Sequence, residues 1–166
     1  MSLNSAYLLL GSNLGNSIAI LNEVTRVLDE KAGKLITKSD IVVSESWGYI
    51  SENKYYNQAL HLQTKLSASG LLDLIMKIED QTGRIRNTEQ YADRVIDIDI
   101  LFYNHNIISL ENLTIPHPLL HLRRFVLFPL NQIAPGYVHP SLHKTVYELL
   151  ENCIDPLKVE LLHDTI

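Results

Sequence analysis

The order of strand-like and helix-like segments constrains the fold of this chain more than any other feature. Runs rich in β-branched, aromatic and other apolar residues predict strands over about 6–10, 35–46, 55–64 and 94–103. Apolar residues at helical spacing predict two helices, one within 16–33 and one within 67–83. Their candidate N-caps are Asn16 or Ser17 and Ser67 or Ser69. The resulting order is β-α-β-β-α-β.

This order is typical of an α+β domain with a ferredoxin-like core, in which two helices pack on one face of an antiparallel sheet. Residues 84–93 show no periodicity and are expected to form a loop before the last core strand. Residues from about 107 onward should add C-terminal strands and helices around the core. Because no repeat or linker divides the chain, residues 1–166 are predicted to form a single domain.

Composition and charge exclude several classes of protein. Hydrophobic residues make up 46% of the chain and charged residues 20%, and no apolar run is long enough to span a bilayer. The net charge of −5 argues against a general nucleic-acid binder. Cys153 is the only cysteine, which excludes an intrachain disulfide and a thiolate metal site. Since MSLNSAYLLLG also lacks the features of a secretory signal, we expect a cytoplasmic protein.

Two aspartates interrupt the hydrophobic strand segment RVIDIDILFY, residues 94–103. Alternation predicts a core face with Ile96, Ile98, Ile100 and Phe102, and an opposite face with Val95, Asp97, Asp99 and Leu101. The two carboxylates would then lie roughly 6–7 Å apart, a separation set by the rise of a strand. Like charges this close raise each other's pKa unless a positive charge lies between them. The pair could belong to an ordinary solvated face, or it could bind a divalent metal together with substrate phosphates.

Arginines gather in the same part of the chain. Five of the six lie between residues 84 and 124, namely Arg84, Arg86, Arg94, Arg123 and Arg124. Because the planar guanidinium group is suited to phosphate, such a cluster around paired aspartates suggests a polyphosphate and its metals. Solvated arginines on a loop are the alternative.

Four further features are ambiguous on local grounds. GSNLG at 11–15 can present backbone N–H groups to a phosphate or form a plain tight turn. Glu79, at the edge of a helical apolar stripe, is expected to face solvent. Tyr55 and Asn57 share a strand face, which could bind a flat heterocycle or form an exposed sheet edge. His117, which lies between two prolines, suits a structural turn as well as a functional loop.

Several segments, taken in order, resemble the signature of a known enzyme family. They are GSNLG, WGY, YYNQAL, GRIR, RVIDIDILFY and IPHPLLHLRRF. Together they are similar to segments of 6-hydroxymethyl-7,8-dihydropterin pyrophosphokinase, a folate-pathway enzyme, from about residue 6 to about residue 150. The Arg-x-x-Asp-x-Asp segment, followed by Pro-His and Arg-x-Phe, is the most specific part of the resemblance.

The resemblance implies an enzyme that moves the pyrophosphoryl group of ATP onto the hydroxymethyl group of the pterin and releases AMP. It implies two Mg²⁺ ions held by Asp97 and Asp99, with ATP as co-substrate. We expect a monomer whose partners are small molecules, without nucleic acid or membrane. The implied catalytic residues are Arg84, Arg94, Asp97 and Asp99.

The resemblance also assigns binding residues. Those for the pterin are Ser44, Glu45, Ser46, Trp47, Tyr55, Asn57 and Phe125, with the ring held between Tyr55 and Phe125. Those for ATP are Glu79, Arg84, Arg86, Tyr91, Arg94, His117 and Arg123. The resemblance therefore moves Glu79 from solvent to a place beside the active site, and it puts Arg86 and Tyr91 in a loop that closes over ATP.

Two departures and two alternatives accompany the resemblance. Many relatives carry more basic residues and a tryptophan where this chain has Asn87, Gln90 and Tyr91, and SES before Trp47 lacks the usual prolines.

A nucleotidyltransferase also pairs a Gly-Ser turn with an Asp-x-Asp strand, but there the two motifs lie close together in sequence. Here Ser12 and Asp97 are 85 positions apart. A non-catalytic pterin- or nucleotide-binding module would need the aspartates only for structure.

Overall fold

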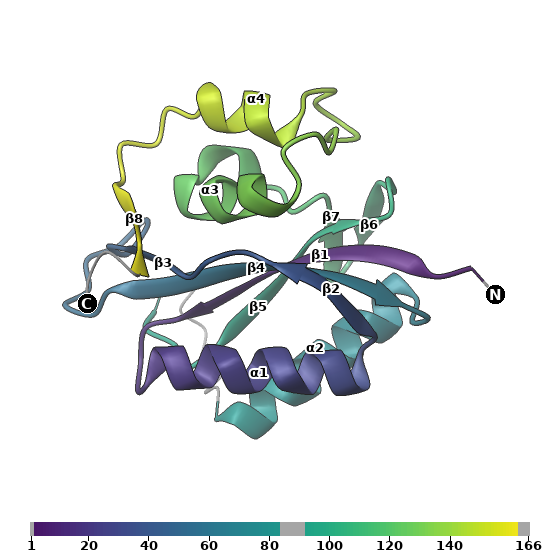
Figure 1. The fold of residues 1–166 in the computed structure, drawn as a ribbon, viewed down its shortest axis with the longest axis horizontal. Helices are drawn as coiled ribbons and strands as arrows, with labels where there is room; N and C mark the ends of the chain where they lie inside the picture. Colours follow the sequence, from purple (N-terminus) through teal and green to yellow (C-terminus); the bar gives the residue numbers. More distant parts are fainter. Residues whose placement is uncertain (1, 84–91, 163–166) are drawn as a thin grey trace.

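A six-stranded antiparallel sheet forms the centre of the computed structural model, which describes residues 2–83 and 92–162 (Figure 1). Its strands lie in the order β5-β1-β4-β3-β8, and β2 also pairs with β4. They are β1 (Asn4–Ser12), β2 (Lys34–Lys38), β3 (Val42–Ser44), β4 (Tyr55–Thr64), β5 (Asp97–Tyr103) and β8 (Val159–Leu161). In the same described residues, β6 (Ile108–Leu110) and β7 (Leu113–Ile115) form a separate hairpin.

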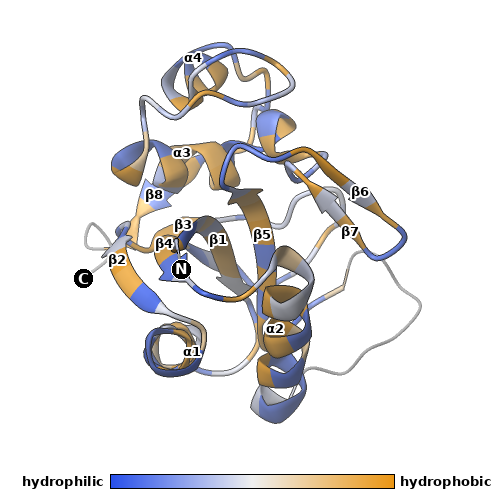
Figure 2. Cartoon of the chain, turned by 90° about the vertical axis from the view of Figure 1, so that its right-hand side faces the viewer, coloured by the Kyte–Doolittle hydropathy of each residue, from blue (hydrophilic) through white to orange (hydrophobic). Residues whose placement is uncertain are grey.

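Different helices cover the two faces of the sheet. α1 (Ser17–Lys31) and α2 (Ala68–Thr82) lie on one face, and α3 (Arg124–Ile133) and α4 (Val146–Glu151) lie on the other (Figure 1). A short 3₁₀ turn, η1 (Leu120–Leu122), precedes α3. The apolar sides of α1 and α2 face the sheet in Figure 2 and bury the larger core cluster. None of the helices in the described residues is long and apolar enough to cross a membrane.

The ends of the two predicted helices follow local chemistry. Asn16 Oδ1 accepts a hydrogen bond from Ala19 N at 3.2 Å, and Ser67 Oγ accepts one from Gly70 N at 3.0 Å. These side chains satisfy backbone N–H groups that lack an intrahelical partner, so Asn16 and Ser67 are the caps. Gly83 ends α2 with φ 101°, a left-handed conformation that glycine adopts without steric penalty.

The strand predicted over 35–46 is interrupted in the structure, because β2 ends at Lys38 and β3 begins at Val42. At the break, Ser39 bonds β4 through both its backbone and its side chain. Its Oγ accepts from Ala59 N at 2.9 Å, and its carbonyl oxygen accepts from the Gln58 side chain at 2.7 Å. Serine competes in this way with a regular ladder, and the chain bends before pairing resumes.

Strand β5 contains a bulge that alters the predicted alternation. Tyr7 of β1 is opposite Phe102, but the next residue, Leu8, is opposite Ile100. Leu101 is therefore an extra residue, and such an insertion shifts all later side chains by one face. Ile98 and Ile100 pack toward α1 and α2 as predicted. Phe102 was predicted to join them, which is wrong, because it packs with Leu101 in the cluster toward α3 and α4.

Arg124 and Asp155 tie the C-terminal segment to the start of α3. The buried Asp155 carboxylate accepts from the backbone N–H groups of Arg124 and Leu157, each at 3.0 Å. The Arg124 guanidinium donates to the carbonyl oxygens of Cys153 at 2.9 Å and Asp155 at 3.2 Å. Because Arg124 N is an orphan donor of the first helical turn, a carboxylate is well suited to this position.

Asp155→Ala should therefore lower the free energy of unfolding by about 1–3 kcal/mol, since two backbone donors lose their acceptor in a buried place. Urea unfolding followed by circular dichroism measures the change. Glu111→Ala, an exposed carboxylate in the β6–β7 turn, is the matched control and should leave the midpoint unchanged. Equal midpoints for Asp155→Ala and wild type would contradict the structural role of this tether.

Candidate active site

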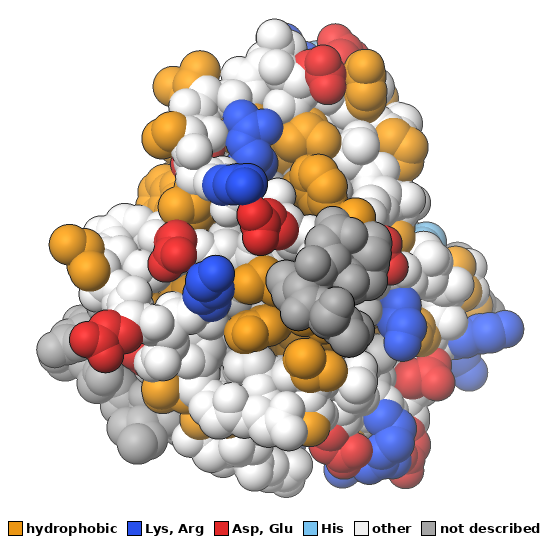
Figure 3. Space-filling model, turned by 60° about the vertical axis from the view of Figure 1, so that its left-hand side comes forward, with side chains coloured by type: hydrophobic (Ala, Val, Ile, Leu, Met, Phe, Trp, Pro, Cys, Tyr) orange, Lys and Arg blue, Asp and Glu red, His pale blue; other side chains and the backbone are white. Residues whose placement is uncertain are grey.

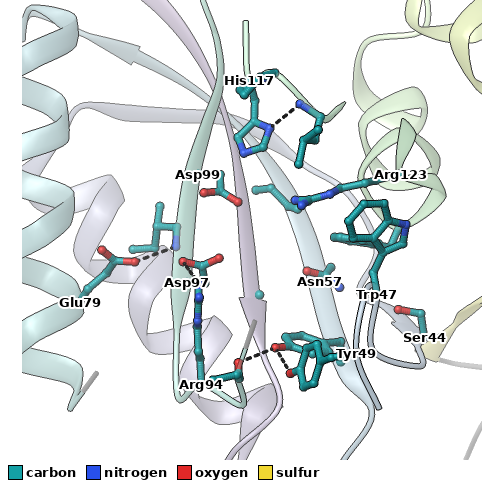
Figure 4. Close-up of a pocket in the computed structure, with 18 of the residues that line it drawn as sticks. Ser44, Trp47, Tyr49, Asn57, Glu79, Arg94, Asp97, Asp99, His117 and Arg123 are labelled. Carbon is teal, nitrogen blue, oxygen red and sulfur yellow. Dashed lines mark hydrogen bonds and ion pairs between the residues drawn. The ribbon is translucent and has the colours of Figure 1, made fainter. Parts of the chain in front are cut away.

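A pocket of about 540 Å³ lies at one end of β1, β4 and β5, between residues of α2 and the segment that leads into α3. Its floor includes Gly11, Asn57 and the two aspartates of β5, and its walls come from the β3–β4 loop, α2 and the segment that leads into α3. Figure 4 shows Glu79, Asp97 and Asp99 on one side of this space and Trp47, with Arg123 beside it, on the other. The molecular face in Figure 3 shows acidic and basic side chains interspersed. The pocket thus combines two chemical environments.

The paired aspartates both reach the pocket, because Asp97 and Asp99 project from the same face of β5 before the bulge (Figure 4). Arg94 lies beside them, with its Nη1 at 3.2 Å from Asp97 Oδ1. Burial, with the neighbouring carboxylate of Asp97, raises the pKa of Asp99 well above its usual range, and Arg123 only partly offsets this rise. The carboxylate pair is therefore short of positive charge.

That deficit suits a hard divalent cation. Bringing such an ion between the two carboxylates would remove their repulsion and favour their ionised forms. No group of three or more His, Cys, Asp or Glu side chains converges as a metal site within 2–83 and 92–162. A cation held by Asp97 and Asp99 would therefore need oxygens from water or phosphate as further ligands, as Mg²⁺ usually has.

Glu79 is buried rather than exposed, so the expectation from its local pattern alone is wrong. Only 3% of its surface is accessible, and its Oε2 accepts a hydrogen bond from Ile98 N at 3.0 Å. β5 is an edge strand with β1 on one side, and Glu79 supplies an acceptor on the other. Glu79 thus fixes the backbone between the two aspartates and also lines the pocket, as the resemblance implied.

The opposite side of the pocket is aromatic and amide-rich. Tyr55 and Asn57, from one face of β4, line it together with Ser44, Glu45, Trp47 and Phe125. Asn57 Nδ2 and Ser44 Oγ are buried without a hydrogen-bond partner in the part of the chain that the structure describes. Buried polar atoms are nearly always paired, so these atoms are available to a polar ligand. The Arg123 guanidinium stacks over Trp47 at 4.4 Å from the ring centroid.

His117 enters the pocket as a neutral side chain. Burial, and then the charge of Arg123, lower its pKa to about 4. Its Nδ1 accepts a hydrogen bond from Leu119 N at 3.2 Å, so the proton of the neutral ring is on Nε2. His117 N also donates to Leu101 O at 3.0 Å, which fixes the segment against β5. His117 can therefore donate one hydrogen bond without adding charge.

The structure brings most of the predicted site residues together. Arg84, Arg86 and Tyr91 lie outside the described residues. Ser46 is not part of the lining, and its hydroxyl donates to Tyr49 O. Sequence reasoning missed Tyr49, which lines the pocket beside Tyr55 with 2.6 Å between their hydroxyl oxygens. Only its place in the WGY segment could have indicated it.

Comparisons with known proteins identify the family. Residues 7–135 match the family model described as 7,8-dihydro-6-hydroxymethylpterin-pyrophosphokinase (HPPK). The chain is 34% identical to the 2-amino-4-hydroxy-6-hydroxymethyldihydropteridine pyrophosphokinase of Haemophilus influenzae, over 95% of this chain and 98% of that protein. It is 41% identical to a folic acid synthesis protein of Dictyostelium discoideum, over 90% of this chain but only 22% of that protein.

Solved structures agree at the level of the fold. The HPPK-DHPS of Plasmodium falciparum superimposes with a TM-score of 0.75 and 20% identity, over 90% of this chain and 41% of that one. The chain thus spans less than half of this structural neighbour. The match to this family model and to curated pyrophosphokinases identifies a phosphoryl-group transferase. The chain belongs to the 7,8-dihydro-6-hydroxymethylpterin-pyrophosphokinase family, which consists of transferases of folate biosynthesis. This confirms the resemblance and favours a pyrophosphokinase over a nucleotidyltransferase.

Glu79→Ala should lower the free energy of unfolding by about 1–3 kcal/mol, because Ile98 N loses its acceptor in a buried place. Glu79→Gln keeps an acceptor oxygen and should lose less. Urea unfolding of both variants measures the difference, with exposed Asp73→Ala on the same helix as control. The proposed support of β5 is contradicted if Glu79→Ala unfolds at the wild-type midpoint.

Proposed function

We propose that this chain transfers the pyrophosphoryl group of ATP to the hydroxymethyl group of 6-hydroxymethyl-7,8-dihydropterin and releases AMP. The observation that carries the proposal is the meeting of Asp97, Asp99 and two arginines with the unpartnered Asn57 amide in one pocket. The aspartates and arginines suit metal-bound phosphates, and the Asn57 amide suits the polar edge of a heterocycle. The names of the relatives from Haemophilus and Bacillus subtilis, both pyrophosphokinases of this pteridine, support the same reaction.

The aromatic side of the pocket is proposed to bind the pterin. The bicyclic ring lies between Tyr55 and Phe125, where stacking orients it and the apolar surface excludes water. Asn57 and Ser44 direct unpartnered polar atoms into this space and pair with the ring's polar edge. Glu45, Ser46 and Trp47 complete the binding loop. Leaving Asn57 unpaired is unfavourable, so the amide selects a ligand with a donor and an acceptor on one edge.

The charged side is proposed to bind ATP. Asp97 and Asp99 would hold two Mg²⁺ ions, which when bound neutralise the triphosphate and polarise the transferred group. Arg94 and Arg123 add fixed positive charge, and His117 donates from Nε2 to a phosphate oxygen. Glu79 supports the strand beneath, and Arg84, Arg86 and Tyr91 are proposed to contact the nucleotide. Transfer of a pyrophosphoryl group then depends mainly on positioning and on stabilisation of the developing charge.

We also propose the finer structural and cellular assignments. The neighbour order β5-β1-β4-β3 supports a ferredoxin-like core. Core clusters on both faces of one sheet support a single domain over residues 1–166. A cytoplasmic location is proposed from the single cysteine and the lack of secretory-signal features, and a monomer is proposed with it.

The direct test is product analysis with ATP, Mg²⁺ and the hydroxymethyl-dihydropterin. We expect AMP to accumulate in equal amount to the pyrophosphorylated pterin, and no AMP when the pterin is left out. Release of inorganic pyrophosphate instead would identify a nucleotidyltransferase. Binding of both ligands without turnover would identify a non-catalytic module. Either result contradicts the proposed reaction.

Asp97→Ala or Asp99→Ala should reduce kcat/KM at least about 100-fold. Each variant loses a ligand of a cation that stabilises the negative charge of the transition state by several kcal/mol. Steady-state AMP formation measures the loss. Calorimetry should also show that Mg²⁺ no longer strengthens binding of a nucleotide analogue. Asp73→Ala, with the same change of charge far along α2, should behave as wild type. Turnover close to wild type in both aspartate variants contradicts their role.

Gly11→Ala should weaken pterin binding by about 3–10-fold, equivalent to one lost hydrogen bond. A Cβ at this position would lie 2.7 Å from Asn57 Oδ1, so the buried amide must turn away from the ligand. Calorimetry with the pterin measures the affinity. Gly136→Ala, where an added Cβ meets nothing within 4 Å, is the matched control. Unchanged pterin affinity in Gly11→Ala would show that the Asn57 amide does not take part in binding the pterin.

A further inference from the structure

Asp93 accepts hydrogen bonds from two segments that are far apart in the sequence. Its Oδ1 accepts from Asn13 Nδ2 at 2.8 Å and from the Tyr49 hydroxyl at 3.0 Å. Its Oδ2 accepts from Asn53 Nδ2 at 2.9 Å. Asn13 follows β1, whereas Tyr49 and Asn53 belong to the β3–β4 loop, residues 45–54. One carboxylate therefore joins three parts of the chain.

The residue after Asp93 is Arg94, whose backbone N–H and carbonyl groups both form hydrogen bonds with Asn13. Arg94 N donates to Asn13 Oδ1 at 2.7 Å, and Arg94 O accepts from the backbone N–H groups of Asn13 at 3.0 Å and Leu14 at 3.2 Å. The guanidinium of Arg94 then reaches Asp97 at 3.2 Å. The position of this arginine in the pocket thus depends on the same short segment that carries Asp93.

The aromatic wall is tied to this segment as well. The Tyr55 hydroxyl donates to Ala92 O at 3.0 Å and lies 2.6 Å from the Tyr49 hydroxyl. Tyr49 and Tyr55 line the pocket, but Asp93 and Asn53 do not. Substitution of Asp93 or Asn53 therefore removes no side chain from the pocket lining and can act on the site only through other residues.

We propose that Asp93 is a positioning residue that holds the β3–β4 loop against Arg94. It thereby fixes the position of the aromatic wall of the pocket relative to the charged wall. An ionised carboxylate suits this place because it accepts several hydrogen bonds at once, and charge-assisted bonds are stronger than neutral ones. The inference rests on the proposed function, since the transfer requires two substrates in one relative orientation. A small displacement between the walls then lowers the rate.

Trp47 gives a readout of the loop that does not depend on activity. It is the only tryptophan in the chain and lies within the β3–β4 loop. In Asp93→Ala we expect stronger acrylamide quenching and lower fluorescence anisotropy of Trp47 than in wild type, because the loop loses its anchor. Asp73→Ala, with the same loss of charge on an exposed helix position, should keep wild-type values. Wild-type quenching and anisotropy in Asp93→Ala overturn the proposal.

Kinetics then separate positioning from a purely structural role. Asp93→Ala should lower kcat about tenfold or more, the effect of losing a hydrogen bond to a charged group. Its affinities for the pterin alone and for a nucleotide analogue alone should change less than kcat. A role confined to stability predicts a lower unfolding midpoint with unchanged kcat at 25 °C, and that result overturns the proposal.

A double-mutant cycle with Asn53→Ala tests whether the effect passes through the bond between the two side chains. Asn53→Ala should lower kcat in the same direction, and the double variant should lose less than the product of the single losses. Strict multiplication of the two losses overturns the proposal. Should Asp93→Ala not fold, Asp93→Asn and Asn53→Ala provide the same comparison. Absence of AMP formation in wild type rejects the proposed function, whereas Trp47 quenching still decides whether Asp93 anchors the loop.

Discussion

The repulsion between Asp97 and Asp99 is the constraint around which the rest of the pocket is arranged. Burial, then the Asp97 carboxylate with Glu79 close by, raises the pKa of Asp99 and makes its ionised form unfavourable unless cations approach it. Arg94 and Arg123 come from different segments and supply part of that charge. Burial and the Asp97 carboxylate raise the pKa of Asp99 more than Arg123 and Arg94 together lower it. In the proposed reaction, an incompletely neutralised site of this kind would favour the cation-bound polyphosphate over the free anion.

Strand β5 contributes side chains both to the pocket and to the apolar clusters on the two faces of the sheet, and its bulge makes this possible. Before the bulge, Asp97 and Asp99 face the pocket while Ile98 and Ile100 enter the core beneath. After it, Leu101 and Phe102 both pack toward α3. A regular strand would have left one of these two side chains on the other face. The bulge thus adds apolar contact close to the carboxylates in the chain.

Much of this arrangement could be predicted from periodicity and residue type. The core strands, both helices and the shared face of Tyr55 and Asn57 depend on local patterns. The features that could not be predicted depend on a distant partner. The break at Ser39 requires Ala59 as its partner, the bulge requires the register of β1, and the burial of Glu79 requires the free edge at Ile98. Asp93 is the extreme case, because its hydrogen-bond donors are 40 to 80 positions away.

The C-terminal part of the chain completes the site that the core only begins. Strands β1, β4 and β5 supply the floor and the carboxylates, but a sheet face without a cover would leave them in water. His117, Arg123 and Phe125 come from the segment after β7, and the bonds between Arg124 and Asp155 hold that segment in place. The same fold without this extension would keep its hydrophobic core toward α1 and α2 and lose the second wall of the pocket. Function here depends on residues added to a common core, as expected where one fold supports many activities.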